Sequence, residues 1–415
     1  MKQKVYFKTF GCRTNLYDSQ VMMGALKDYD ITEDENEADV VVVNSCTVTN
    51  GADSHVRSYI SQVEKNGGAK IFLTGCGAHT KGEKLLEQGR VSGVFGQSEK
   101  LKIDEMLKRE EPFYELGDLN YIDEAVVDDF IGKSRAFIKI QEGCDFRCSY
   151  CIIPSVRGDA RSMPESRILE QITKLAGNGF GEFILTGTNV GSYGQKTDSS
   201  IASLMKRISQ IRGVRRIRLG SVEPVQMSDE FKEILSEPWL EKHLHIALQH
   251  TSPQMLKYMN RRNIYKKDRE LFELLAEKGF AIGTDFITGH PGESQELWAE
   301  AMRNAKDLPL THLHAFTYSK RDGTPAATMK PEVSGNIAKE RLHELETLVV
   351  SKNLEFRKSF SGELDVLVES EKDGLFVGYD QHFNKIIIES DEDLVGNWIN
   401  ITKYDAREDA NYARV

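Results

Sequence analysis

Glu142-Gly143-Cys144-Asp145-Phe146-Arg147-Cys148-Ser149-Tyr150-Cys151 is the stretch of this sequence that decides its fold and its chemistry. It follows an apolar strand predicted over residues 136–141 and spaces its cysteines as C-x3-C-x2-C. Three thiolates at this spacing can wrap one corner of a [4Fe–4S] cluster, and because the cluster needs four ligands, one iron stays open. The amino and carboxylate groups of S-adenosylmethionine could chelate that iron, with Tyr150 as an aromatic wall near the adenine. The motif therefore predicts an open cluster on Cys144, Cys148 and Cys151.

Three alternative roles are open to these cysteines. A structural zinc site usually has four nitrogen or sulfur ligands, and no matching fourth residue lies nearby. A redox C-x-x-C pair would use Cys148 and Cys151 and would leave Cys144 idle. Structural cysteines without any ligand are the third alternative. We expect the open-iron cluster because it uses all three thiols.

Residues 133–360, around this motif, alternate between strands and helices. Strands are predicted over residues 136–141, 182–186, 216–221, 244–249, 282–288 and 312–317. Helices are predicted between them, for example over residues 164–176, 201–211 and 297–305, and a closing helix over residues 338–359. Six such units predict a partial, open (β/α)6 barrel, because a full eight-fold barrel normally needs more chain.

The first 110 residues also alternate, with strands predicted over residues 5–10, 40–44 and 71–74 and helices over residues 19–27 and 54–65. This pattern favours a doubly wound α/β domain with a parallel sheet. Cys12, Cys46 and Cys76 each follow one of the three strands. Because the carboxyl ends of parallel strands face one crevice, we expect these cysteines to converge and to hold a second cluster. Buried structural cysteine is the alternative.

Two further segments complete the predicted α/β architecture. Residues 111–132 are acidic and irregular at their start and are interpreted as a linker. Residues 361–415 contain short strands predicted over 363–369, 374–378, 385–390 and 398–402, which indicate a small C-terminal β-barrel.

The composition constrains where the protein acts and what it binds. Hydrophobic residues make up 40% and charged residues 28%, and 54 Lys and Arg against 64 Asp and Glu give a net charge of −10. No signal peptide or membrane span is expected, so the predicted compartment is the cytoplasm. An acidic chain can bind nucleic acid only through local basic patches. Two basic runs, over residues 206–218 and 261–269, are candidates, although a solvated face accounts for each equally well.

Several motifs accompany the cysteines. They are Gly11-Cys12-Arg13-Thr14-Asn15, Asn44-Ser45-Cys46-Thr47-Val48-Thr49, Leu73-Thr74-Gly75-Cys76, Ile153-Pro154, Arg157-Gly158, Leu185-Thr186-Gly187-Thr188-Asn189, Tyr193-Gly194, Gly283-Thr284-Asp285-Phe286-Ile287-Thr288-Gly289-His290-Pro291-Gly292-Glu293 and Arg321-Asp322-Gly323-Thr324-Pro325-Ala326. With these motifs the sequence resembles the methylthiotransferase family of radical S-adenosylmethionine enzymes over essentially its whole length.

The resemblance implies an auxiliary [4Fe–4S] cluster in the N-terminal domain, a radical barrel in the middle and a TRAM-like domain that binds RNA. Residues 216–224 and 191–194 resemble the branch that acts on N6-threonylcarbamoyladenosine beside the tRNA anticodon. The implied reaction is methylthiolation at C2 of that base, with a tRNA anticodon stem-loop, a flavodoxin- or ferredoxin-type electron donor and a sulfur donor as partners. Isopentenyladenosine in tRNA and a ribosomal-protein aspartate are the alternative substrates.

Polar residues at the barrel strand ends are the candidates for contacts to S-adenosylmethionine or substrate. Besides Tyr150, they are Thr186, Gly187, Ser221, Glu223, Gln249 and Asp285. Each could equally be a satisfied polar group of the core. Arg157 and Arg161 are the basic residues expected nearest a phosphate, and the histidines on or beside barrel strands, His243, His245, His312 and His314, are expected to be structural.

A non-catalytic iron–sulfur protein, either a cluster carrier or a redox sensor, is the rival from another functional class. The predicted barrel argues against it, because a carrier needs no pocket. Absence of S-adenosylmethionine cleavage under reducing conditions would favour it.

Overall fold

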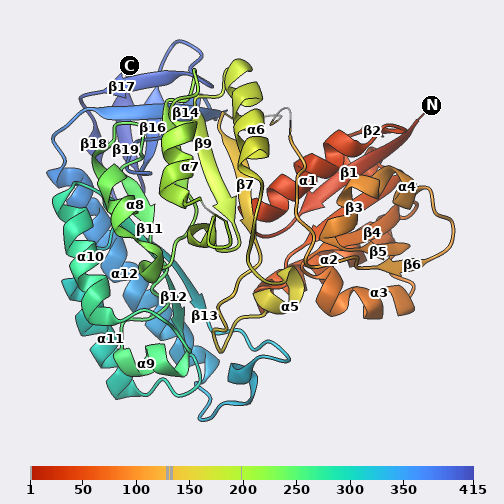
Figure 1. Cartoon of the computed structure of the whole chain (residues 1–415), viewed down its shortest axis with the longest axis horizontal. Coiled ribbons are helices and arrows are strands. Elements are labelled where there is room, and N and C mark those ends of the chain that lie inside the picture. Colours follow the sequence, from red (N-terminus) through yellow and green to blue (C-terminus); the bar gives the residue numbers. More distant parts are fainter. Residues whose placement is uncertain (1, 128–129, 131–133, 198) are drawn as a thin grey trace.

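The computed structural model describes residues 2–127, 130, 134–197 and 199–415. Figure 1 shows an N-terminal sheet with its helices on the right, a barrel in green and teal on the left, and a C-terminal sheet in blue above the barrel. Among the described helices, none is both long and apolar enough to cross a membrane.

The N-terminal part is a six-stranded parallel sheet. Its strands, in spatial order, are β2 (Tyr29–Ile31), β1 (Gln3–Thr9), β3 (Val40–Ser45), β4 (Lys70–Gly75), β5 (Gly93–Phe95) and β6 (Phe113–Glu115). Its helices are α1 (Arg13–Ala25), α2 (Asn50–Asn66), α3 (Glu83–Glu87) and α4 (Ile103–Leu107).

Helices cover both faces of this sheet because its central strand is apolar on both sides. In β3, Val40 and Val42 pack with α1 and α4, whereas Val41 and Val43 pack with α2 and α3. Successive side chains of a strand point to opposite faces, so a continuous valine run suits a strand buried on both. The strand order reverses between β1 and β3, and ligands bind at the carboxyl ends of strands beside such a point.

The central part is a partial barrel. Its parallel strands are β7 (Ala136–Glu142), β9 (Glu182–Gly187), β10 (Arg216–Leu219), β11 (His243–His245), β12 (Ala281–Thr288) and β13 (His312–Thr317). Single bridges, Ile217 to Leu240 and Val222 to Ile246, join β10 to β11, and the short β8 (Arg161–Ser162) pairs antiparallel with β7. The six parallel strands confirm the predicted partial α/β barrel.

Helices flank the barrel strands. They are α5 (Ile153–Arg157), α6 (Glu165–Gly177), α7 (Ile201–Ile208), α8 (Asp229–Glu233), α9 (Pro253–Tyr258), α10 (Tyr265–Glu277), α11 (Gln295–Asp307) and α12 (Gly335–Ser359). A large hydrophobic core lies between the barrel strands and several of these helices, and α1 also contributes to it.

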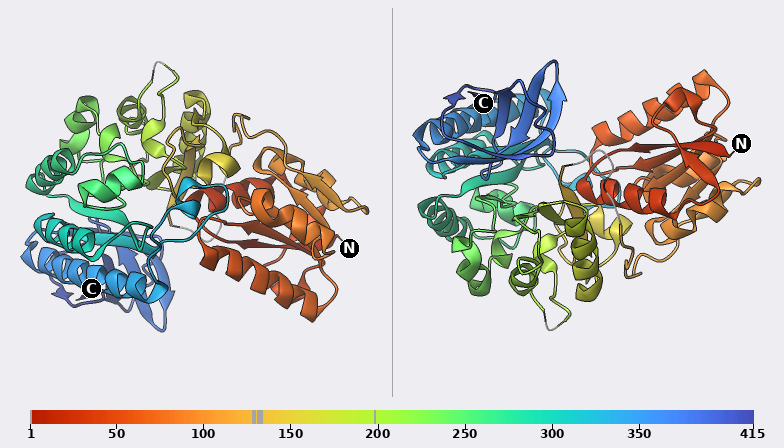
Figure 2. Two further views of the ribbon diagram at one scale, coloured as in Figure 1. Left: turned by 90° about the horizontal axis from the view of Figure 1, so that it is seen from below. Right: turned by 90° about the horizontal axis from the view of Figure 1, so that it is seen from above.

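The C-terminal part is a curled sheet in the order β17 (Trp398–Ile401), β14 (Leu364–Lys372), β15 (Leu375–Tyr379), β16 (Lys385–Glu389), β19 (Asn411–Arg414) and β18 (Asp405–Ala406). It caps the amino ends of the barrel strands: Arg216 Nη2 donates to Asp365 Oδ2 at 2.7 Å, and Arg218 Nη2 donates to the Asp380 carbonyl at 2.7 Å. Both views of Figure 2 place it beside the barrel, with the N-terminal sheet at the other end of the molecule.

The structure differs from the sequence expectations in several elements. Strand β6 lies within the stretch interpreted as a linker, so the first sheet extends further than expected. Strand β11 ends at His245, although the prediction extended the strand to residue 249. Strands β18 and β19 were missed because charged and turn residues separate them and leave no apolar run.

Candidate active site

A cavity of about 310 Å³ lies at the carboxyl ends of the barrel strands. Cys144, Cys148 and Cys151 lie on its wall, as the sequence predicted for a cluster facing the barrel interior. Val48 and Thr49, which follow Cys46 in the N-terminal part, line the same cavity. The loop that follows Cys46 therefore closes the cavity beside Cys144, Cys148 and Cys151.

Five of the residues predicted to contact cofactor or substrate line this cavity. They are Tyr150, Ser221, Glu223, Gln249 and Asp285. Gln249 has a positive φ of 67°, a backbone conformation that is uncommon outside glycine and that clusters at functional sites.

Thr186 and Gly187 do not belong to the described lining of the cavity, which instead includes the next two residues, Thr188 and Asn189. Thr186 is 4% exposed, and a Cβ at Gly187 would lie 2.7 Å from the Gln141 carbonyl oxygen. Strand β9 packs closely on β7 at this point, so the polar edge of the cavity begins two residues later than expected.

Polar groups surround the barrel cysteines. Asn189 Nδ2 lies 3.4 Å from Cys144 Sγ, and Arg261 Nη1 lies 3.7 Å from Cys148 Sγ. Glu223 holds that guanidinium in place, with Arg261 Nη1 donating to its Oε1 at 2.9 Å. A fixed positive charge beside a thiol favours the thiolate, which is the form that binds iron.

Burial has the opposite effect on the barrel thiols. It raises the pKa of Cys151 to about 12 and raises the pKa of Cys144 above its ordinary value. A buried thiolate needs positive charge nearby, and bound iron together with Arg261 would supply it. The donor set therefore fits a thiolate-ligated cluster.

The N-terminal cysteines also converge. Cys12 and Cys76 both act on the pKa of Cys46, which burial raises to about 11. Gly11 permits this approach: its φ is +101°, and a Cβ there would lie 2.6 Å from the Cβ of Cys46. Cys12 is exposed, whereas Cys46 and Cys76 are buried. Three thiols following β1, β3 and β4 thus share one crevice, a donor set that fits a second cluster.

Arg157 links the two halves of the site. It follows the last barrel cysteine on α5, is 2% exposed, and its Nε lies 3.1 Å from Cys76 Sγ. Its terminal nitrogens bind Asp18 at 2.9 Å and also Asn15 and Glu142. The same arginine therefore contacts a cysteine of the N-terminal sheet and the strand end that precedes the barrel motif.

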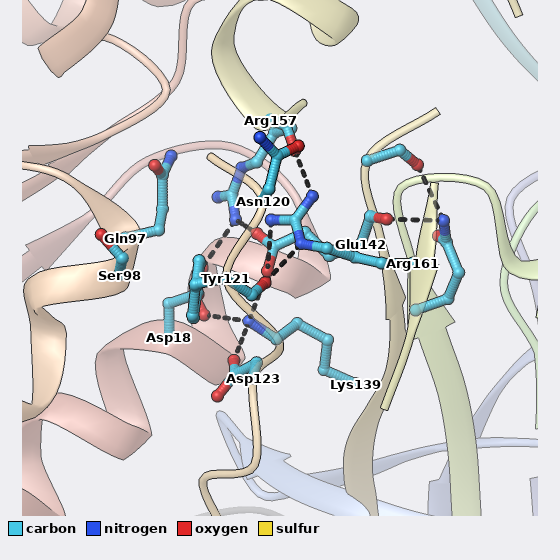
Figure 3. A network of polar contacts seen from close by, with 12 residues as sticks. Asp18, Gln97, Ser98, Asn120, Tyr121, Asp123, Lys139, Glu142, Arg157 and Arg161 are labelled. Atoms are coloured by element: carbon cyan, nitrogen blue, oxygen red, sulfur yellow. Dashed lines mark hydrogen bonds and ion pairs between the residues drawn. The ribbon is translucent and has the colours of Figure 1, made fainter. Parts of the chain in front are cut away.

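The carboxylates around Arg157 form a buried network that includes Lys139 (Figure 3) and also Lys100. Lys139 Nζ lies 2.6 Å and Lys100 Nζ 2.9 Å from Asp18, and both lysines pair with Asp123. Burial alone would raise the pKa of Asp18, but Lys100, Lys139 and Arg157 lower it far below its usual range. The network stays charged and joins α1 and the segment after β6 to the first barrel strand.

Several basic residues predicted to meet phosphate are structural instead. Arg157 binds Asp18 and Glu142 within the buried network. Arg161 donates to backbone carbonyls, including that of Tyr121 at 2.5 Å. Arg216 and Arg218 lie inside the barrel on Glu182. Each of the two basic runs therefore mixes buried and exposed residues.

The sequence interpretation missed Asn189 and Arg261 as parts of the site. Asn189 lies just beyond a barrel strand and could have been found by the rule that identified Thr186. Arg261 carries no such signal, because its place in a basic run suggested an exposed side chain, whereas the loop after α9 turns it inward.

Comparisons with known proteins agree with this geometry. Residues 4–96 match the family model described as Uncharacterized protein family UPF0004, and residues 138–305 match the Radical SAM superfamily. The solved structure of TsrM, a radical S-adenosylmethionine methyltransferase from Kitasatospora setae, has a TM-score of 0.60 at 14% identity and covers 79% of this chain and 77% of its own. Fold and cysteine motif together define a radical S-adenosylmethionine enzyme, whose class implies one [4Fe–4S] cluster and S-adenosylmethionine.

Sequence relatives narrow the class. A protein named "Putative methylthiotransferase" from Helicobacter pylori is 52% identical over 99% of both chains. Threonylcarbamoyladenosine tRNA methylthiotransferase MtaB of Bacillus subtilis is 33% identical over 96% of this chain and 93% of its own. The tRNA-2-methylthio-N(6)-dimethylallyladenosine synthase of Fervidobacterium nodosum is 33% identical over 95% and 94%. The chain belongs to the radical S-adenosylmethionine methylthiotransferase family and is a transferase.

Proposed function

We propose that this protein methylthiolates C2 of N6-threonylcarbamoyladenosine beside the anticodon of tRNA. The observation that carries the proposal is the shared cavity: it is bordered by Cys144, Cys148 and Cys151 on one side and by the loop after Cys46 on the other. Sulfur insertion into a C–H bond needs both centres to reach one substrate atom. The substrate branch rests on the likeness of residues 216–224 and 191–194 and on relatives named for that reaction.

In this proposal Cys144, Cys148 and Cys151 hold the cluster that binds S-adenosylmethionine, and Cys12, Cys46 and Cys76 hold the auxiliary cluster. Once loaded, the first site would supply the chemistry that removes hydrogen from an unactivated C–H bond, the second would supply sulfur, and a second S-adenosylmethionine would supply the methyl group.

The chain's own residues position these groups and exclude water. Asn189 and Arg261 lie within reach of cysteine sulfurs and fix their orientation. Ile152, Ile287 and Phe316 add apolar surface to the cavity, which shields a reactive radical from solvent. Tyr150 contributes an aromatic face for a nucleobase, and Ser221 and Glu223 supply polar groups for a ribose or an amino acid moiety.

The partners follow from the chemistry. An anticodon loop is single-stranded, so its base can enter the cavity without leaving a duplex. We assign RNA binding to a TRAM-like C-terminal domain, residues 361–415, although this tail has 13 acidic residues against 5 basic ones. This domain would contact RNA through hydrogen bonds and base stacking more than through ion pairs with phosphates. A flavodoxin- or ferredoxin-type electron donor and a sulfur donor complete the set, and the cytoplasm is the compartment where these partners meet.

Mass spectrometry of tRNA nucleosides from cells with and without the gene tests the substrate. Loss of the 2-methylthio form of threonylcarbamoyladenosine, restored by the wild-type chain but not by Cys148→Ala, supports the proposal. Loss of the methylthiolated isopentenyl nucleoside instead would reassign the substrate within tRNA. Unchanged tRNA together with an unmodified ribosomal-protein aspartate would assign a protein substrate.

A further inference from the structure

Four imidazoles from two strands of the barrel lie next to one another. His243 and His245 come from β11, and His312 and His314 come from β13, with β12 between them. Asp285 of β12 lines the cavity and pairs in register with His314. Phe316 and Ala247, two residues after His314 and His245 in the chain, also line the cavity. Through Asp285 the imidazole cluster therefore adjoins the cavity.

The barrel makes room for these rings with a glycine. A Cβ at Gly283 would lie 2.7 Å from His245 Nδ1 and 3.0 Å from His243 Nε2. Any other residue would push the imidazoles away from one another. The rings of His245 and His314 lie with their centroids 4.7 Å apart and their planes tilted by 30°.

Three donor atoms of this cluster come close together. His245 Nε2 lies 3.1 Å and His314 Nδ1 lies 3.8 Å from the same oxygen of Asp285, and the three atoms all fall within 4.8 Å of one another. Tetrahedral ligands at about 2.0–2.2 Å from a zinc ion are about 3.4 Å apart. The side chain of His314 is 62% exposed, so its ring can turn to close the remaining distance.

The buried donor of this group is not satisfied by a hydrogen bond. His245 is 7% exposed, and its Nε2 has no hydrogen-bond partner among the described residues. Asp285 is near enough for an ion pair, but its oxygen does not lie along the ring N–H direction. A ligand at this point would pair the atom. The other oxygen of Asp285 accepts a hydrogen bond from Ser221 Oγ at 3.0 Å, which fixes the carboxylate.

We propose that His245, Asp285 and His314 bind one divalent transition-metal ion, separate from both cysteine sets. Two imidazoles and one carboxylate suit Zn²⁺, and three protein ligands leave at least one position for water or substrate. That position adjoins the cavity through Asp285. The site does not depend on which nucleoside the enzyme modifies.

The test is zinc binding by the reconstituted holoenzyme. Wild-type protein, His314→Ala and the matched control His343→Ala, which removes an exposed histidine on α12, are dialysed anaerobically against Zn²⁺, and zinc and iron are measured together. We expect one zinc per chain in the wild type and in His343→Ala. Because loss of an outer-shell partner alone weakens metal binding about 10–100-fold, loss of His314 should weaken it by at least about tenfold.

Iron content separates this result from loss of the clusters. The proposal requires iron to be equal in all three proteins while zinc falls only in His314→Ala, and anomalous scattering at the zinc edge to place the ion between the three side chains. An equal zinc content per chain in His314→Ala and in the wild type would overturn the proposal. Zinc bound by cysteine thiols outside this site would give that result. A wild type that retains no zinc after dialysis would also overturn it.

Discussion

Replacing Arg157 by methionine tests the buried network that joins the two halves of the site. The substitution keeps the volume but removes the charge beside Asp18 and Glu142. Asp18 retains Lys139 at 2.6 Å and Lys100 at 2.9 Å, whereas Glu142 retains only Lys139 at 3.4 Å and Arg161 at 3.6 Å. Removing one partner of a buried ion pair costs about 3–5 kcal/mol, and because the lysines remain we expect about 3 kcal/mol.

The assay is anaerobic urea unfolding of proteins with equal iron content. Arg147→Met is the matched control, because Arg147 pairs with Asp159 at 2.6 Å and both side chains are more than half exposed. An exposed pair contributes about 0–1 kcal/mol. Arg157→Lys should recover part of the stability but lose its cluster faster than the wild type, since a lysine keeps the charge without the planar fork that reaches Cys76.

The reasoning is refuted if Arg157→Met loses no more stability than Arg147→Met. It is also refuted if Arg157→Met retains both clusters as long as the wild type does, because the contact to Cys76 would then have no role.

Three further predictions follow from single contacts. Gly11→Ala should lose about half of the iron, because a Cβ there would press on Cys46, and iron analysis with Gly24→Ala, which meets open space, as the control checks this. Burial lowers the pKa of His382 to about 4, whereas in the unfolded chain this histidine takes up a proton below about pH 6.5. The free energy of unfolding should therefore fall by about 2 kcal/mol from pH 6.5 to pH 5. Urea unfolding at several pH values should show a flatter profile in this range for His382→Gln. Arg321→Ala should cost about 3 kcal/mol, because it leaves buried Asp53 without its partner at 2.7 Å; equal urea midpoints would exclude this.

The sequence alone predicted those parts of the site that depend on spacing. All six cysteines follow strands, and strand ends in parallel sheets meet, so their convergence could be inferred without coordinates. The six parallel barrel strands were recognisable for another reason: short segments that contain branched apolar residues alternate with helical segments.

Residues that act through distant partners could not be predicted. Arg157 looked like a phosphate ligand because nothing near it in sequence shows that Asp18 and Cys76, 139 and 81 residues away, will surround it. Arg216 and Arg218 did offer a signal, because alternating positions in a strand point to one face, which here is the barrel interior.

Iron analysis of three anaerobically reconstituted proteins tests the two-centre account most directly. They are the wild type, the triple alanine variant of Cys144, Cys148 and Cys151, and the triple alanine variant of Cys12, Cys46 and Cys76. The account predicts about eight irons per chain in the wild type and about four in each variant, since each cysteine set would hold its own four-iron cluster. About four irons in the wild type, or no loss in either variant, would contradict it.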